Sequence, residues 1–340
     1  MLQLLEIRER VKRFYQRYDL YLLPIIKFVF ALTAFSTINK QIGYDVRLNR
    51  LPIVLGISLL SAFTPSAIMV LLATAVSILH VYFISPILSI IVIAILMILY
   101  LLFARYTPKQ GYVLLAVPIL FILKIPYVIP ILLGVVSTPI SIVSTGCGVI
   151  IYFLFQIIKT AVTMQSNVSI DDIIQLYTHV IDSLKGNRQM IMTIVIFAMI
   201  IMVTYFVRKL SIDYAFEISI LAGALTGILG FLISYLVLSR SDQILSMIFG
   251  FIVSTVLVYI IHFFRLTLDY SGVEHAQFED DVYYYYVKAI PKVTVTVPQV
   301  NVKRFNVKSG GRREFSDPDM EDTDAGVDEY DYEYEDDTES

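Results

Sequence analysis

The sequence predicts an all-α polytopic membrane protein with about eight transmembrane helices. Of its 340 residues, 57% are hydrophobic and only 16% are charged, and the mean hydropathy is +0.74. Many apolar runs reach the roughly 20 residues that a helix needs to cross the hydrocarbon core of a bilayer. This balance excludes an ordinary soluble domain. The first 18 residues are too charged for a cleavable signal peptide.

A proline-broken pattern occurs twice and suggests two repeated units. LPIVLGISLLSAFTPSAI at 51–68 aligns without a gap with IPYVIPILLGVVSTPISI at 125–142, and seven of the 18 positions are identical. Each copy is an apolar run, a Thr-Pro pair and a longer apolar run, and the pairs are Thr64-Pro65 and Thr138-Pro139. Proline lacks a backbone donor and disfavours helix at the preceding residue, so we expect a helix interruption at each pair.

Interruptions at corresponding places favour a transport site near the middle of the membrane. There the freed backbone groups would be satisfied by protein or by a wet cavity. The alternative is that the prolines serve helix packing only, because membrane helices are rich in proline anyway. The first unit, 51–84, is apolar for 34 residues. A continuous helix would be about 50 Å long, against a core of about 30 Å. A short re-entrant piece followed by a full span fits this run.

The chain divides into a surface helix, a membrane domain and a tail. Residues 1–18 predict an amphipathic basic helix on the membrane surface or, alternatively, a plain topology signal, and 19–268 form the transmembrane domain. We expect spans at 20–38, 51–84, 86–104, 111–136, 138–158, 190–207, 214–238 and 244–264. Residues 169–186 have apolar side chains at helical spacing and a final glycine, which predicts an interfacial helix whose acidic residues face water and bind no metal.

The tail is predicted to leave the membrane. Residues 1–269 have a balance of +8 charges, and 270–340 a balance of −11. The segment 269–308 is soluble, tyrosine-rich and strand-like, because apolar and polar residues alternate from Lys292 to Val307. The end, 309–340, is acidic and is predicted to be disordered, since like charges repel and little surface can be buried.

No motif predicts an enzyme. The sequence contains no P-loop, GxSxG, HExxH or cysteine–histidine ligand spacing, and Cys147 is its single cysteine. We therefore expect no catalytic residue, no metal site, no cofactor, no nucleic-acid partner and no ATPase activity of its own. Any transport would use a solute gradient or a separate ATPase.

Ionisable and small polar residues inside apolar runs are the candidate substrate path. Lys124 has long apolar stretches on both sides, so it is either a deep intramembrane cation or the mark of a loop between two shorter segments. Glu217 is either part of this path or a solvated or arginine-paired residue near the interface. The full set of path candidates is Lys124, Thr64, Pro65, Thr138, Pro139, Ser141, Ser144, Thr145 and Glu217. Ser219, Gly223 and Gly227 recur every four residues, a spacing that predicts close helix packing.

Three segments carry a family resemblance. FEDDVYYYYVKAIPK, LKIPYVIPILLG and RKLSIDY make most of residues 1–306 similar to an uncharacterised group of multi-pass membrane proteins of clostridial bacteria. Members of this group are sometimes labelled ABC-transporter permease. The resemblance implies a bacterial cell-membrane protein and implies no site residues.

The sequence therefore predicts a membrane transporter or permease-like component. The alternative is a membrane scaffold that recruits an ATPase or a cytoplasmic protein through its tyrosine-rich acidic tail. Basic residues before the first span place the N-terminus in the cytoplasm, and eight spans return the tail to the same side. This count places Lys40, Arg47, Arg50, Arg105 and Lys109 outside, which conflicts with the positive-inside rule. A re-entrant segment at 51–63 would instead reverse the side of everything after it and place Arg105 and Lys109 inside.

Overall fold

The computed structural model describes residues 2–165, 180–210, 212, 214–265, 274–279 and 284–289. Its helices are α1 (Leu2–Ile42), α2 (Leu51–Ala62), α3 (Ser66–Ile84), α4 (Pro86–Tyr106), η1 (Pro108–Gln110), α5 (Gly111–Ile122), α6 (Val128–Val136), α7 (Ser141–Gln165), α9 (Arg188–Arg208), α10 (Ala215–Val237), η3 (Ser241–Gln243) and α11 (Ile244–Arg265). Two strands, β1 (Glu274–Glu279) and β2 (Tyr284–Ala289), pair antiparallel.

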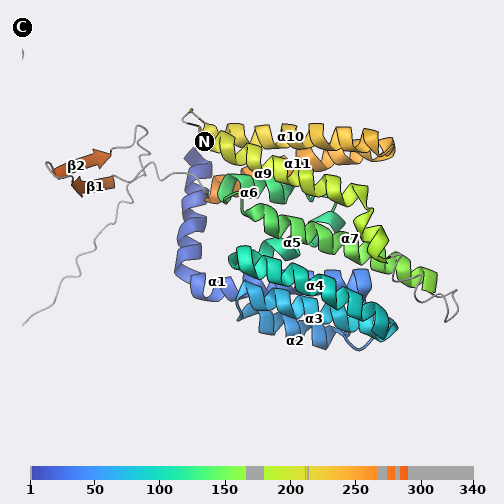
Figure 1. Cartoon of the computed structure of the whole chain (residues 1–340). Coiled ribbons are helices and arrows are strands. Elements are labelled where there is room, and N and C mark those ends of the chain that lie inside the picture. The colour runs from blue at the N-terminus through green and yellow to red at the C-terminus, as the bar shows by residue number, and fades with distance from the viewer. Residues whose placement is uncertain are drawn as a thin grey trace, which may run out of the picture.

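Seven of the described helices are long and apolar enough to cross a membrane: α1, α3, α4, α7, α9 with the helical residues before it, α10 and α11 extended by η3. They run roughly side by side (Figure 1). Their outer surfaces are apolar; on α4, for example, Ile90, Ile98 and Leu101 are 63%, 65% and 60% exposed. Such a surface suits lipid and not water. The prediction of an α-helical, multi-pass membrane protein is confirmed.

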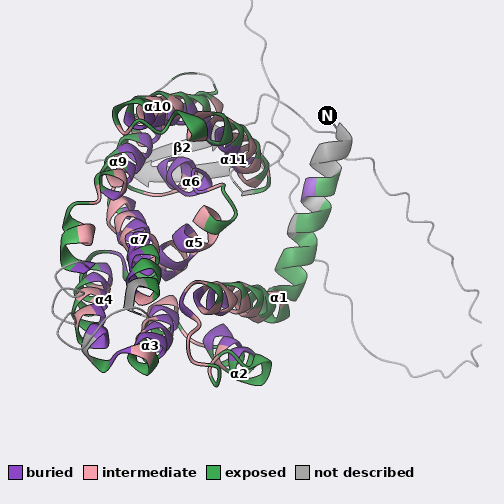
Figure 2. Ribbon diagram, turned by 90° about the vertical axis from the view of Figure 1, so that its right-hand side faces the viewer, coloured by how far each residue is buried: buried purple, intermediate pink, exposed green. Residues whose placement is uncertain are grey.

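The N-terminal part of α1 crosses one end of the bundle instead of joining it. The helix has a non-helical residue at Tyr18, where the two parts meet at a steep angle (Figures 1 and 2). Ile7, Val11, Phe14 and Tyr18 are exposed at helical spacing, so this part presents an apolar stripe. An amphipathic helix in the plane of the membrane surface has this arrangement. We call this end of the bundle the proximal end and the other the distal end.

Hydrogen bonds identify which segments share an end. At the distal end, His80 near the end of α3 bonds Asn39 of α1 through Nε2 (2.9 Å) and accepts from the backbone N–H of Asp45 (3.2 Å). At the proximal end, the Ser66 hydroxyl at the start of α3 donates to the Pro108 carbonyl (3.3 Å). The chain thus passes from the proximal to the distal end in α1, returns in α2, and crosses twice more in α3 and α4.

The segment 111–136 does not form the single span that its length suggests. It folds into α5 and α6, which have only 12 and 9 residues. Gln110, before α5, donates from Nε2 to the Ser137 hydroxyl after α6 (3.0 Å), so the segment begins and ends together at the proximal end. It is a re-entrant hairpin, and α7, α9, α10 and α11 follow it as four alternating crossings (Figure 1).

This topology removes the conflict for Arg105 and Lys109 and leaves it for Lys40, Arg47 and Arg50. The chain returns to the proximal end through α2 and the segments on either side of it before α3 and α4 cross, so Arg105 and Lys109 lie at the proximal end with the N-terminus. Because the α5–α6 hairpin does not cross, the Arg208–Lys209 turn lies at the same end. Lys40, Arg47 and Arg50 lie at the distal end. The expected single span over 111–136 is wrong, because its proline-rich middle makes a turn at 123–127 instead of continuing as helix.

The helices bury two apolar cores. One lies among α1, α3, α4, α5 and α7 and includes Phe35, Met69, Phe103 and Leu154. The other lies among α5, α6, α7, α9, α10 and α11 and includes Phe197, Phe231 and Phe251. Helices α5 and α7 contribute to both cores, so the re-entrant hairpin is attached to the whole bundle.

Of the tail, the structure describes the two strands. Phe278 pairs with Tyr285, and three of the four consecutive tyrosines lie in β2. The hairpin falls within the segment expected to be strand-like, but before the alternating stretch. The stretch from Lys292 to Val307, the acidic end and most of the interfacial helix expected at 169–186 lie outside the described residues. Within the described part of that helix, 180–185 are helical up to Gly186, as expected.

Candidate functional site

Both Thr-Pro pairs interrupt helices, as predicted. Thr64 and Pro65 separate α2 from α3, and Thr138 and Pro139 separate α6 from α7. Pro65 is extended (φ −61°, ψ 155°) and precedes the first helical residue of α3. Both interruptions adjoin the same short segment, Pro108–Gly111, since Ser66 bonds to Pro108 and Gln110 bonds to Ser137. The superposition of the two units stays a prediction.

The interruptions lie at an end of the bundle and not near its middle. Each is followed by a full-length helix, α3 with 19 residues and α7 with 25 residues. A helix of 19 residues is about 28 Å long and already spans most of the hydrocarbon core. The two Thr-Pro pairs are therefore proximal turns. Thr64 and Pro139 are half-buried, and Pro65 and Thr138 are exposed.

A buried hydroxyl–amide network holds the second interruption. Gln110 donates to the hydroxyls of Ser137 (3.0 Å) and Ser141 (3.2 Å) and accepts from Ser144 (2.7 Å). Ser141 is fully buried, as is Ser144, and Thr145 is 1% exposed and donates to the Ser141 carbonyl. Each of these side chains has a partner, so the network stabilises the turn between α6 and α7 and leaves little polar capacity for a solute.

Arg208 completes this network from α9. Its guanidinium donates to the carbonyl of Val135 and to that of Ser137 (2.8 Å). These carbonyls lie at the C-terminal end of α6, where helix carbonyls lack intrahelical donors and a cation is favourable. Nothing local in the sequence links Arg208 to a segment about 70 residues earlier.

Lys124 lies at the tip of the re-entrant hairpin. It adopts left-handed backbone geometry (φ 61°) between α5 and α6, and its side chain is exposed. From the proximal end, the 12 residues of α5 extend about 18 Å, which is well inside a core of about 30 Å. Lys124 thus marks a turn between two short helices, as one of the two sequence interpretations has it, and its place at hydrocarbon depth stays a prediction.

A polar cavity of about 460 Å³ connects this tip to the distal end. We call this cavity the vestibule. Its polar lining includes Lys124 of the hairpin, Gln156 of α7, Gln189 of α9, and Arg240, Asp242 and Gln243 of the α10–α11 connection. Backbone that is not helical at membrane depth is tolerated where it lines such a cavity.

Aromatic rings close the vestibule toward the proximal end. Tyr127, at the tip, stacks on Phe251 of α11 with ring centroids 3.8 Å apart, and it meets Phe231 of α10 edge to face at 5.2 Å. Behind them, Phe197 of α9 lies 5.9 Å from Phe231. The vestibule is thus open at one end and blocked by a packed apolar layer at the other.

The remaining predicted residues lie away from the vestibule, at the α9–α10–α11 contacts. Glu217 is half-buried at the start of α10, and its backbone carbonyl accepts from the Tyr259 hydroxyl (3.1 Å). Ser219, Gly223 and Gly227 are buried on one face of α10. A Cβ at Gly223 would collide with Thr204 of α9, and one at Gly227 would meet Phe251 of α11. These two glycines therefore permit close helix approach.

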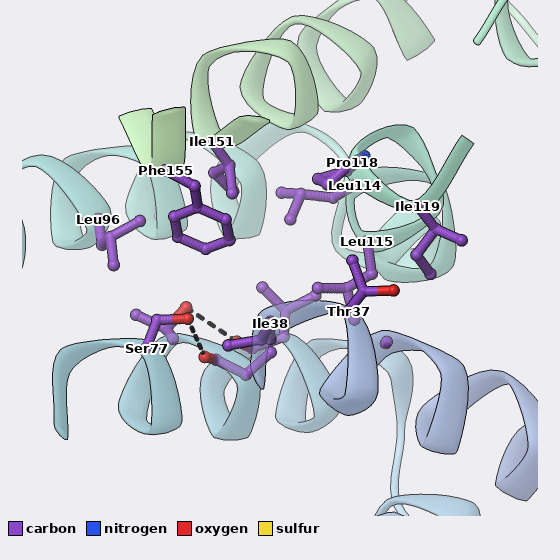
Figure 3. Close-up of a pocket in the computed structure, with 14 residues that line it drawn as sticks. Thr37, Ile38, Ser77, Leu96, Leu114, Leu115, Pro118, Ile119, Ile151 and Phe155 are labelled. Atoms are coloured by element: carbon purple, nitrogen blue, oxygen red, sulfur yellow. Dashed lines mark hydrogen bonds between the residues drawn. The ribbon is translucent and has the colours of Figure 1, made fainter. Parts of the chain in front are cut away.

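A second, smaller cavity is no solute site. It measures about 30 Å³ and lies between α1 and α3 on one side and α5 and α7 on the other. Figure 3 shows Phe155, Leu114 and Leu115 facing Ile38 and Ser77 across it. The Ser77 hydroxyl donates to its own helix at Ala73 (2.8 Å). The space suits about one water molecule and is mainly apolar.

The vestibule residues other than Lys124 were not predicted. Gln156 interrupts the apolar run IYFLFQIIK, and a polar residue in such a run could have been chosen as a candidate from the sequence. Arg240 and Asp242 lie in a short charged segment between two apolar runs, a pattern that predicts only a turn. The fold places this turn and the hairpin tip in the same cavity wall. Comparison with protein-family models, with curated proteins and with solved structures gave no match to this chain.

Proposed function

We propose that this protein is a transporter or permease-like component that moves a small polar solute across the cell membrane of a bacterium. The observation that carries the proposal is the vestibule, which extends from the distal end to the tip of a re-entrant hairpin. Transporters commonly bind their solutes where interrupted helices expose backbone inside the membrane. A bundle with a purely structural role has no need of a polar cavity reaching its interior.

The arrangement fits alternating access. The vestibule is accessible from the distal end, and the aromatic layer around Tyr127 separates it from the proximal end. Movement of α6 relative to α9 and α11 would open the other side. The energy would come from a solute gradient or from a separate ATPase.

The proposed orientation places the proximal end in the cytoplasm. That end carries the basic N-terminal part of α1 together with Arg105, Lys109, Arg208 and Lys209. Cytoplasmic segments of membrane proteins are rich in lysine and arginine. The vestibule would then open to the outside. The alternative role as a scaffold depends on the acidic tail beyond residue 308, which lies outside the described residues.

A flux assay tests the proposal. The purified chain is reconstituted into liposomes, which are incubated with a defined mixture of amino acids, dicarboxylates, hexoses and phosphate, and the internal solutes are measured by mass spectrometry. We expect at least one solute to enter faster than into protein-free liposomes. Ser246→Trp fills the vestibule and should abolish this entry. Leu245→Trp, at a neighbouring residue that is 80% exposed, should not.

Two results would contradict transport: entry of every solute at the rate of protein-free liposomes, or equal entry with Ser246→Trp and wild type. The second result would mean that any solute takes another route.

A further inference from the structure

We propose that the vestibule binds a small anion that carries a carboxylate or phosphate group, with Lys124 and Arg240 providing the positive charge. This inference rests on the proposed transport function and specifies the chemical class of its solute. The shared chemistry is a carboxylate or a phosphate group on a polar body.

The charge of the vestibule favours an anion. Its lining includes two cations, Lys124 and Arg240, and one acidic residue, Asp242. Lys124 and Arg240 come from different parts of the chain, one at the hairpin tip and one at the α10–α11 connection. A solute between them therefore meets positive charge at the inner and the outer part of the cavity, and Coulomb attraction is stronger here than in bulk water.

The protein fixes the position of Lys124. Its carbonyl oxygen lies so close to α11 that a Cβ at Gly250 would be 3.0 Å from it, and Tyr127 packs against the same glycine. The backbone of the turn is anchored as well, since the N–H of Lys124 donates to the Phe121 carbonyl (3.1 Å) and the N–H of Ile125 donates to the Leu120 carbonyl (3.0 Å). Lys124 thus projects from a braced turn, which limits the entropy lost when a solute binds.

The neutral lining suits a hydroxylated or amide-bearing body. Gln156 donates to the Tyr152 hydroxyl (2.6 Å), and the Tyr152 ring stacks on Phe121 at 4.3 Å, so both groups are held in place. Tyr235 and Gln243 add further polar groups to the wall. A cavity of about 460 Å³ falls in the range of small-molecule sites, about 300–1,000 Å³.

A thermal-unfolding measurement tests anion binding separately from transport. Cys147 is the single cysteine and is buried, so a thiol-reactive fluorogenic dye reports its exposure on unfolding of the full chain in detergent. The probes are succinate, inorganic phosphate and glucose 6-phosphate, with glycerol and choline as neutral and cationic controls, all at equal ionic strength. We expect at least one anion to raise Tm by about 2–4 °C and both controls to leave it unchanged.

Variants identify the site. Lys124→Gln and Arg240→Gln should each remove the anion-induced shift, and Lys124→Arg should retain it. Lys185→Gln, at an exposed lysine that does not line the vestibule, should behave as wild type. A response to succinate alone identifies a carboxylate, and a response to the two phosphates alone identifies a phosphate.

The inference is overturned if no anion raises Tm, if choline raises it as much, or if Lys124→Gln and Arg240→Gln respond as wild type does. The flux assay keeps the two proposals apart. Anion binding without flux would reject transport and leave the site intact, and flux of neutral or cationic solutes alone would reject the anion site and leave transport intact.

Discussion

Thr204 is a single residue that determines how closely three helices approach. It is fully buried on α9, and it contacts the positions where Gly134 of α6 and Gly223 of α10 lack a side chain. Its hydroxyl oxygen has no hydrogen-bond partner in the described structure. A buried hydroxyl without a partner is unfavourable, so its presence reflects how little room the contact leaves.

Gly223→Ala should destabilise the protein by about 1–3 kcal/mol, because its new methyl group would collide with the Thr204 hydroxyl. Adding Thr204→Ala should restore most of the loss, since the nearest remaining atom of residue 204 would then lie 3.5 Å away, in ordinary contact. Gly56→Ala is the matched control: nothing lies within 4 Å of its Cβ position, and alanine favours helix more than glycine does. Thermal unfolding read through Cys147 measures all three. Equal Tm values for Gly223→Ala and Gly56→Ala would contradict this packing.

At the scale of elements, the re-entrant hairpin depends on Arg208. The guanidinium donates to the carbonyls of Val135 and Ser137 at the end of α6. Helix α6 has only 9 residues. Short helices are stable mainly through tertiary contacts. The attachment of α6 to α9 therefore needs this side chain.

Arg208→Gln should lower stability by about 1.5–3 kcal/mol, because hydrogen bonds from a charged donor are lost at partly buried carbonyls. Lys209→Gln should change stability little, since Lys209 is exposed and its ammonium lies only over the Tyr205 ring, at 4.7 Å. Chemical unfolding of both variants in detergent gives the comparison. Similar losses for the two variants would show that Arg208 acts only as a surface charge.

Local chemistry predicted the elements better than their depth in the membrane. Proline disfavours helix at the residue before it, and the interruptions at Pro65 and Pro139 were predicted on this basis, although Pro24 and Pro118 lie inside helices. The position of each interruption along the bundle depends on the helix that follows it. Because α3 and α7 are full-length helices, both interruptions lie at the proximal end. The reversal at Lys124 was only one of two interpretations, because a left-handed turn and a polar interruption of a long span look alike in sequence.

The site was predicted less completely than the elements. Lys124 was predicted because a charged residue within a long apolar run is costly in a membrane and is rarely found there without a function. Arg240, Asp242 and Gln156 each have an ordinary local explanation, and they become a site only because α7 and α11 flank the hairpin tip. The serines after Pro139 were predicted to line a solute path, and in the structure Ser141 bonds Ser137 and Ser144 bonds Gln110.

At the scale of the whole molecule, the bundle predicts which loops share a side. In a Cys147→Ala background, Val46→Cys at the distal end should react with a membrane-impermeant maleimide on intact cells, since residue 46 is 71% exposed. Lys109→Cys at the proximal end should react only after the cells are opened. Labelling of both Val46→Cys and Lys109→Cys on intact cells would restore a single crossing over 51–84 and reject the return of the chain through α2.

The vestibule is the central feature of the proposed function, and the reactivity of residue 124 tests it directly. Lys124→Cys in the Cys147→Ala background is treated on intact cells with a small, charged, membrane-impermeant thiosulfonate. The structure predicts modification from the same side as Val46→Cys, although the residue lies about 18 Å from the proximal end by the length of α5. A Lys124→Cys that reacts only from the side of Lys109→Cys, or from neither side, would contradict a vestibule that reaches the hairpin tip.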